Sequence, residues 1–282
     1  MYDLPVTYSN QTMKLSIVLS TQPAQFQAVT FRGNLEKNLQ SISSLGYDGV
    51  ELAIRDPGLI DLDDIEKLVN KNGLSVPAIG TGQAWGEEGL SFTDPDQNVR
   101  RAAIERIKSH IPVAVRFKAV IIIGLIRGMV KPGVTHTKAM DWLIGALCQC
   151  CETAMLNGIR LALEPINRYE TSLINNVEQG LEMIARVGAE NFGLLLDTFH
   201  MNIEEPVIEN SIRQCGDRIF HFHAADSNRA YPGAGHIDFK SLLQALYATG
   251  YQGFVSGEFL PIPDAETAAK RNIVYLRQLE GD

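Results

Sequence analysis

Short apolar segments alternate with amphipathic segments along almost the whole chain. The apolar segments are six or seven residues long, are rich in Ile, Val and Leu, and end near Gly, Asn-Gly or Pro, which predicts buried β-strands. The intervening segments carry apolar residues at helical spacing, as in residues 34–47, 61–73 and 94–117. The predicted strands are residues 14–20, 49–54, 75–81, 119–125, 159–165, 192–198, 219–225 and 253–259.

This rhythm predicts one closed (β/α)₈ barrel, a TIM barrel, over residues 13–282. Eight βα units follow one another with no linker-like stretch. The structural rival is a doubly wound open sheet, which is expected to carry a Gly-rich phosphate-binding turn after its first strand. The segment "VLSTQPAQFQ" has no such turn. Residues 1–12 are predicted to be a polar N-terminal extension.

Composition indicates which partners the protein is expected to bind and in which cellular compartment it is expected to work. The chain of 282 residues has a formal net charge of -8, which disfavours nucleic acid as a partner. The longest apolar stretch, residues 119–126, is too short to span a membrane, and the first residues do not resemble a signal peptide. Three of the four cysteines are crowded at residues 148–151 in a helical pattern, which is typical of reduced thiols and predicts a cytoplasmic protein.

Ionisable residues stand at the ends of the last four predicted strands. Glu164 ends the fifth strand, Asp197 the sixth and Glu258 the eighth, while the seventh presents His221 and His223 on one side. Any one of them alone is more often a helix cap or a core residue than a ligand. Barrel enzymes place their chemistry at this end of the strands, so four neighbours in register predict a metal site. The mixed oxygen and nitrogen set suits Mn²⁺ best, with Mg²⁺ or Co²⁺ as alternatives and Zn²⁺ as a further ion in vitro.

Several motifs then indicate a family. The segments "EPINRYET", "LLLDTFHMNIEE", "HFHAADSNRAYPGAGHIDF" and "GEF" resemble the ketose 3-epimerase branch of the xylose isomerase-like TIM barrels. In the N-terminal half, "MKLSIVLST", "VELAIRDP", "AIGTGQA" and "IIGLIRG" are similar to the 5-keto-L-gluconate epimerase type within that branch. The resemblance runs from about residue 13 to the end of the chain.

The resemblance implies roles for individual residues. The implied metal ligands are Glu164, Asp197, His223 and Glu258. Glu164 and Glu258 are also the implied acid–base pair. His221 is expected either to be structural or to support a metal ligand, and it is left out of the catalytic set. The residues implied to contact the substrate are Glu170, His200 and Arg229. The resemblance also implies a homo-oligomer, either a dimer or a tetramer.

The chemistry of epimerisation explains why such residues are needed. A carbon beside a ketone loses its proton and regains one on the opposite face, so two carboxylates must flank it and a cation must stabilise the charge that develops. Xylose-type isomerases shift a hydride and commonly carry a lysine in "EPKP". Here "EPIN" has no lysine, which favours proton transfer.

Arginines at predicted strand ends suggest the charge of the substrate. Arg55, Arg127, Arg168 and Arg229 together favour a keto-sugar acid. The resemblance implies that this acid is of the 5-keto-L-gluconate or D-tagaturonate type. A neutral ketose is the alternative, in which case these arginines pair with neighbouring acids.

Other functions on the same scaffold stay open to different degrees. Hydroxypyruvate isomerisation and inosose dehydration use a similar site and are not excluded. A repair nuclease of the AP endonuclease type needs histidines on earlier strands, and strands two to four end without any. A sugar-binding protein without catalysis is disfavoured because both glutamates are retained.

Overall fold

The strands form where the chain is apolar on both faces, as parallel strands covered on both sides require. In β4 (Val120–Ile123) all four residues are buried. Val120 and Ile122 pack with residues of neighbouring strands inside the barrel, while Ile121 and Ile123 belong to the larger core between the strands and the helices. Strand residues thus alternate between two apolar environments.

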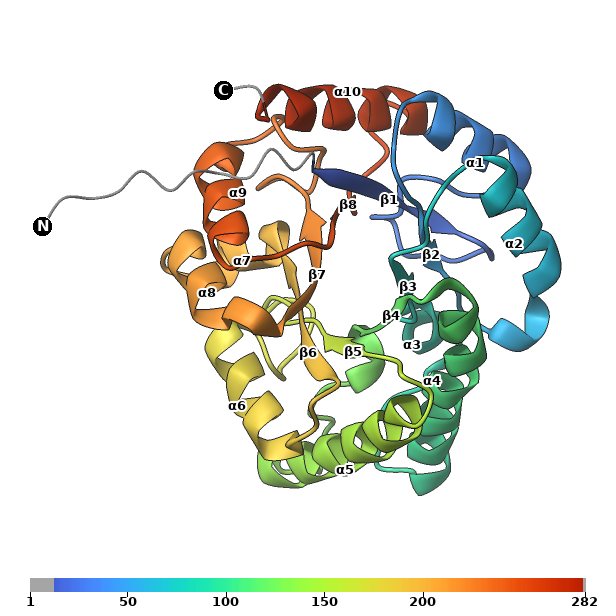
Figure 1. Cartoon of the computed structure of the whole chain (residues 1–282). Coiled ribbons are helices and arrows are strands. Elements are labelled where there is room, and N and C mark those ends of the chain that lie inside the picture. The colour runs from blue at the N-terminus through green and yellow to red at the C-terminus, as the bar shows by residue number, and fades with distance from the viewer. Residues whose placement is uncertain (1–12, 281–282) are drawn as a thin grey trace, which may run out of the picture.

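Eight parallel strands pair in chain order, and β8 returns to β1, so the sheet closes into a barrel (Figure 1). This confirms the predicted TIM barrel. The computed structural model describes residues 13–280, so the predicted extension at residues 1–12 lies outside the described residues. The strands are β1 (Lys14–Ser20), β2 (Glu51–Ala53), β3 (Ala78–Gly80), β4, β5 (Leu161–Leu163), β6 (Phe192–Asp197), β7 (Ile219–Ala224) and β8 (Phe254–Gly257).

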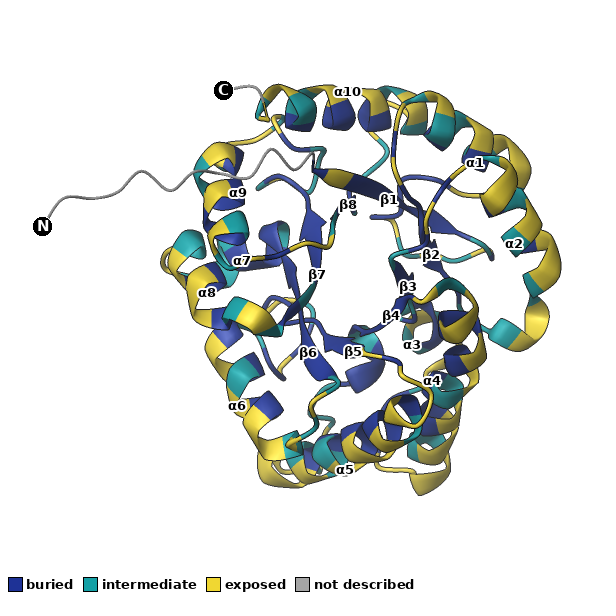
Figure 2. Ribbon diagram, viewed as in Figure 1, coloured by how far each residue is buried: buried dark blue, intermediate teal, exposed yellow. Residues whose placement is uncertain are grey.

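Helices surround the strands and turn their apolar faces inward (Figure 2). Most begin at a side chain that accepts a backbone N–H, such as Asn34 before α1 and Asp61 before α2. The helices are α1 (Leu35–Ser44), α2 (Leu62–Lys71), α3 (Gln83–Glu88), α4 (Gln97–Phe117), α5 (His136–Met155), α6 (Val177–Val187), α7 (Thr198–Glu204), α8 (Ile208–Cys215), α9 (Phe239–Ala248) and α10 (Ala265–Gln278). Short 3₁₀ turns are η1 (Pro57–Leu59), η2 (Leu125–Arg127) and η3 (Gly216–Arg218).

Most strands end before the apolar runs that predict them. Residues at the ends of these runs therefore lie beyond the sheet, at the rim of the barrel. The sequence predicts a strand over residues 159–165, but β5 ends at Leu163. The backbone N–H of Glu164 still bonds to the carbonyl of Ile123 at 3.2 Å, and Pro165 then has no N–H to continue the ladder. Glu164 therefore stands at the rim, held by the last hydrogen bond of its strand.

Two further features of the described residues bear on the sequence analysis. Between residues 13 and 280, no helix is both long and apolar enough to cross a membrane. The four cysteines are free thiols, and Cys148 is the exposed one.

Candidate active site

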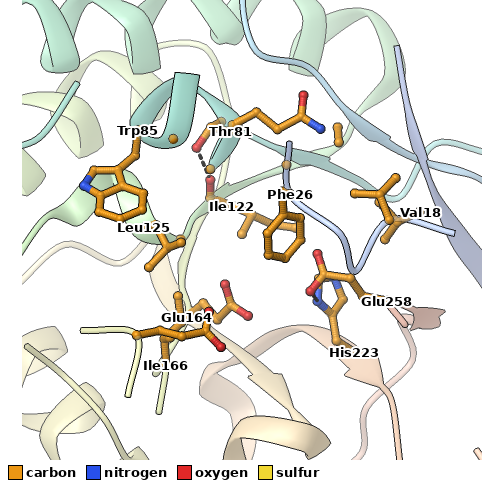
Figure 3. Close-up of a pocket in the computed structure, with 18 of the residues that line it drawn as sticks. Val18, Phe26, Thr81, Trp85, Ile122, Leu125, Glu164, Ile166, His223 and Glu258 are labelled. Atoms are coloured by element: carbon orange, nitrogen blue, oxygen red, sulfur yellow. Dashed lines mark hydrogen bonds and ion pairs between the residues drawn. The ribbon is translucent and has the colours of Figure 1, made fainter. Parts of the chain in front are cut away.

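Four ionisable side chains converge where strands β5 to β8 end. Glu164 and Glu258 each follow directly on a strand, Asp197 is the last residue of β6, and His223 lies near the end of β7. One ligand atom from each lies within 4.8 Å of the others. In Figure 3, Glu164 and Glu258 come from different sides of the cavity, and His223 lies beside Glu258. The structure brings together the four predicted ligands.

Two atoms of this cluster lack the partners that buried polar atoms normally have. Nδ1 of His223 lies 3.8 Å from Oδ2 of Asp197 and 3.6 Å from Oε2 of Glu258, too far for good hydrogen bonds. Within residues 13–280, neither Nδ1 of His223 nor Oδ2 of Asp197 has a hydrogen-bond partner, and both atoms are buried. The other oxygen of Asp197 accepts the N–H of Phe199 at 2.7 Å, at the start of α7. Unpaired donor atoms aimed at one point fit a bound cation.

Glu51 on β2 is an essential part of this arrangement that the sequence analysis missed. Its Oε2 accepts hydrogen bonds from Nε2 of His221 at 2.7 Å and from Nε2 of His223 at 2.9 Å, and all three residues are buried. Because Nε2 of His223 carries the proton, Nδ1 keeps its lone pair free for a metal ion. The signal was present in "GVELAI", where an acid interrupts an apolar strand.

Glu51 also explains His221, which the sequence analysis expects either to be structural or to support a metal ligand. Burial opposes ionisation of Glu51, but the imidazoles of His223 and His221 outweigh it and lower the pKa of the carboxyl. A carboxylate thus stays charged inside the barrel. Together with His221 and His223 it forms a second group of residues that could hold a metal ion, sharing His223 with the first. Since its atoms already satisfy one another through hydrogen bonds, we assign it to orienting His223.

Burial and mutual repulsion make the cluster retain protons. Burial raises the pKa of Glu164, and the neighbouring charge of Glu258 raises it further. Burial likewise raises the pKa of Glu258. Burial opposes the charge on His223, but Glu51 and Glu258 outweigh it, so the pKa of His223 is raised as well. A cation bound here would displace protons that the cluster holds without it.

A second set of polar residues covers the cluster. Nδ2 of Asn167 lies 3.0 Å from Oε1 of Glu170 and 2.7 Å from Nδ1 of His200. Burial lowers the pKa of His200 to about 4, so the ring is neutral at pH 7, and its Nε2 lies 3.6 Å from Oε1 of Glu164. The Nη1 of Arg229 donates to Oε1 of Glu170 at 2.9 Å. The predicted Glu170, His200 and Arg229 therefore all line the same cavity.

Three of the four predicted arginines are not in the lining of this cavity. Arg55 pairs with Glu88 at 3.4 Å, and the exposed Arg168 pairs with Glu204 at 2.7 Å. Arg127 is fully buried, and its guanidinium donates to backbone carbonyls, including that of Ile174 at 3.1 Å. Of these predicted arginines, the structure places Arg229 in the lining, while Arg127 lies behind it, where its charge acts on Glu164 and Glu170. The reason is that the turns after the strands aim these side chains at local acids and carbonyls.

The cavity above the cluster has a volume of about 300 Å³. Its outer walls are apolar and come from Phe26, Trp85, Leu125 and Ile166 (Figure 3). The lining does not include any of the four cysteines. A small cavity with apolar walls and a few convergent polar groups is typical of a small-molecule site.

Comparisons with known proteins agree with this geometry. The sequence matches the family described as xylose isomerase-like TIM barrel over residues 39–279. The chain belongs to this family. An L-ribulose 3-epimerase of Mesorhizobium japonicum is 32% identical to this barrel over 235 residues, which cover 83% of this chain and 78% of that protein.

Two further relatives are also epimerases. The 3-dehydro-D-guloside 4-epimerase of Escherichia coli is 27% identical to this xylose isomerase-like barrel, over 88% of this chain and 95% of that protein. A solved structure of an L-ribulose 3-epimerase superposes with a TM-score of 0.82 and 27% identity, covering 96% of this chain and 95% of that chain. The predicted ketose 3-epimerase branch and the enzyme class, an isomerase of the epimerase type, are thereby confirmed.

The raised pKa values predict how cation binding depends on pH. A group whose pKa is raised in the folded state stabilises the protein fully at a pH below its pKa in the unfolded state, and this stabilisation is lost as the pH rises. The stability of the metal-free protein should therefore begin to fall above about pH 4.5 because of Glu164 and Glu258, and above about pH 6.5 because of His223. The increase in melting temperature on adding Mn²⁺ should therefore grow from pH 5 to pH 8. Calorimetry at both pH values measures this, and Glu182→Gln on exposed α6 is the control. An increase that shrinks with pH would contradict the assignment.

The orienting contact of Glu51 generates a second prediction. Glu51→Gln keeps the size of the side chain but replaces a carboxylate with a neutral amide, so His223 loses its charged partner. The affinity for Mn²⁺ should fall about 10- to 100-fold. Titration calorimetry of the folded variant measures this directly, and Glu170→Gln, which is in the cavity but not in the cluster, should change the affinity far less. Unchanged affinity in Glu51→Gln would remove Glu51 from the metal site.

Proposed function

We propose that this protein is a metal-dependent sugar epimerase that inverts the carbon beside the carbonyl group of a keto-sugar. The observation that carries the proposal is the convergence of Glu164 and Glu258, from different sides, on a point that Asp197 and His223 share. Proton removal from one face and return to the other requires two carboxylates placed in this way. The family and the epimerase names of the relatives support the same reaction class.

The residues present suit one divalent cation. Three carboxylates and one imidazole favour Mn²⁺ over a thiolate-binding ion, and the unpaired atoms of Asp197 and His223 would be satisfied by it. When bound, the cation supplies positive charge beside the oxygens where negative charge develops as the proton leaves. Glu164, Asp197, His223 and Glu258 are the residues that would hold it.

The two glutamates are suited to exchange protons with carbon. Without a cation, burial and the nearby charge of Glu258 raise the pKa of Glu164. With a cation bound, one carboxyl group of the pair must still carry a proton, because one proton leaves the carbon and another returns to its opposite face. One carboxylate then takes the proton from the substrate while the other carboxyl donates one to the opposite face. In the reverse reaction, Glu164 and Glu258 exchange the roles of acid and base.

The covering residues would hold the reacting oxygens. His200 is neutral, and its Nδ1 faces the side-chain amide of Asn167, so Nε2 carries the proton and points toward Glu164. Arg229 presents a guanidinium whose Nε has no hydrogen-bond partner among residues 13–280. We assign His200 and Arg229 to contacts with the carbonyl and hydroxyl oxygens of the sugar, and Glu170 to holding Arg229.

The cavity favours an uncharged keto-sugar over the keto-sugar acid of the 5-keto-L-gluconate type. Its lining carboxyl groups belong to Glu51, Glu87, Glu164, Glu170 and Glu258. Among the described residues, Arg229 is the one arginine in the lining, and it is already paired with Glu170. A substrate carboxylate would meet the repulsion of these carboxyl groups, and within the described lining only Nε of Arg229 is free to bind it. The volume suits one monosaccharide.

The two-glutamate assignment predicts hydrogen exchange at one carbon. The Mn²⁺-loaded protein in D₂O should incorporate deuterium beside the carbonyl of at least one of D-fructose, D-tagatose and L-ribulose. Glu258→Gln and Glu164→Gln should each lower the rate by at least about 100-fold, because an amide cannot take up the proton. Proton NMR follows the exchange, with bound metal measured in each sample. Glu182→Gln is the exposed control, and full exchange in Glu258→Gln would exclude Glu258 as an acid or base.

The charge of the cavity predicts the substrate class. The ratio kcat/KM should be at least about tenfold higher for the best of these neutral ketoses than for D-tagaturonate or the 5-keto-gluconates. Coupled assays at fixed ionic strength measure the ratio. Arg55→Gln and Arg168→Gln should leave it unchanged, since neither residue lines the cavity. A preference for the acids would restore the substrate class that the sequence favours.

A further inference from the structure

The loop after β7 is built around one buried carboxylate. Asp226 is fully buried although it lies outside the metal cluster. Its Oδ1 accepts the backbone N–H of Ser227 at 2.7 Å and of Ile237 at 3.2 Å, and its Oδ2 accepts that of Gly233 at 2.9 Å. Burial opposes the charge, but these backbone N–H groups outweigh it and lower the pKa of Asp226. One side chain thus holds together a loop of twelve residues, from 226 to 237.

The same loop fixes the backbone of Arg229. The N–H of Arg229 donates to the carbonyl of Asp226 at 2.8 Å, and the N–H of Asp226 donates to the carbonyl of Ala230 at 2.9 Å. Arg229 has a φ of 60°, a left-handed conformation that a residue with a side chain adopts only when its surroundings impose it. Its carbonyl accepts the N–H of Leu260 at 2.9 Å, two residues after Glu258. The loop is therefore tied to the end of β8 as well.

The fixed backbone places the guanidinium of Arg229 over the cavity. It lies 5.3 Å from the ring centre of Phe26 and 4.7 Å from that of Phe199, and its Nη1 bonds to Glu170. We propose that Asp226 is the positioning residue of Arg229: its carboxylate closes the loop through Ser227, Gly233 and Ile237 and so holds the guanidinium at the cavity. This inference rests on the proposed function only where Arg229 is taken to contact the sugar.

Two substitutions disturb this carboxylate in different ways. Asp226→Asn places an amide where three N–H groups converge, so at least one of them loses its acceptor. Gly235→Ala keeps the carboxylate but adds a Cβ that would lie 2.2 Å from Oδ1 of Asp226 and 2.5 Å from Oγ of Ser227, so the carboxyl must shift. Asp264→Asn is the matched control, because Asp264 also accepts a backbone N–H, from Thr267, but lies at the exposed start of α10.

An NMR signal reports the position of Arg229 without any activity. Its Nε–Hε group lies beside two aromatic rings, so the ring currents of Phe26 and Phe199 displace its proton resonance, which is assigned by its absence in Arg229→Lys. Asp226→Asn and Gly235→Ala should each move this signal toward the position of an exposed arginine, while Asp264→Asn leaves it in place. A signal that stays in place in both folded loop variants overturns the proposal.

Kinetics supply the second readout. Asp226→Asn should raise the KM for the best neutral ketose about tenfold, whereas a purely structural defect lowers the active fraction and leaves KM unchanged. In the Arg229→Lys background, Asp226→Asn should raise KM much less, because the two residues act through one contact. Fully additive effects would overturn the proposal. If the wild type epimerises no ketose, the proposed function has failed, and the NMR signal alone decides on Asp226.

Discussion

The shared hydrogen-bond acceptor of His221 and His223 is the interaction on which the site depends. A carboxylate inside a barrel is costly unless partners compensate its charge, and Glu51 has two imidazole N–H groups on one oxygen. The same bond fixes which nitrogen of His223 carries a proton and leaves the other facing Asp197 and Glu258. Without Glu51, His223 would be free to turn its ring or exchange tautomers, and the four groups would not present a consistent set of ligand atoms. The geometry of the ligands at the rim is thus determined by Glu51 and His221, which lie deeper in the barrel.

The outer part of the site follows the same logic of compensated charge. Arg229 is balanced by Glu170, and its loop is held by Asp226, whose charge is balanced by backbone N–H groups. Asn167 connects Glu170 to His200. Each group that would contact the sugar is therefore held by a residue that does not contact it. Such supporting contacts limit rotation of the long side chains and reduce the reorganisation needed when a substrate binds.

Much of the fold and the centre of the site could be predicted because both depend on simple periodicities. Buried parallel strands are apolar runs, and residues just past their ends, such as Glu164 and Glu258, must lie at one end of the barrel whatever the loops do. The positions of the arginines depend on turns, which this reasoning does not predict. Arg127 is drawn into the interior by backbone carbonyls, and Arg168 turns outward to Glu204. Glu51 lies inside a strand and was passed over as part of an apolar run, although an acid there requires a buried partner.

The fold and the metal cluster do not by themselves decide which carbon is inverted. Relatives named as 3-epimerases and as a 4-epimerase share this fold with the chain. In the proposed mechanism the cluster determines where a proton leaves and returns, so the identity of the carbon would depend on how the rest of the sugar lies in the cavity. We expect that orientation to be set by Arg229 and by the apolar walls from Phe26, Trp85, Leu125 and Ile166. These walls offer few hydrogen bonds to distant hydroxyl groups, which favours discrimination by shape over recognition of each hydroxyl. Phe26 contributes both to the wall and to the aromatic pair around Arg229, so the shape of the cavity and the position of its one arginine are coupled.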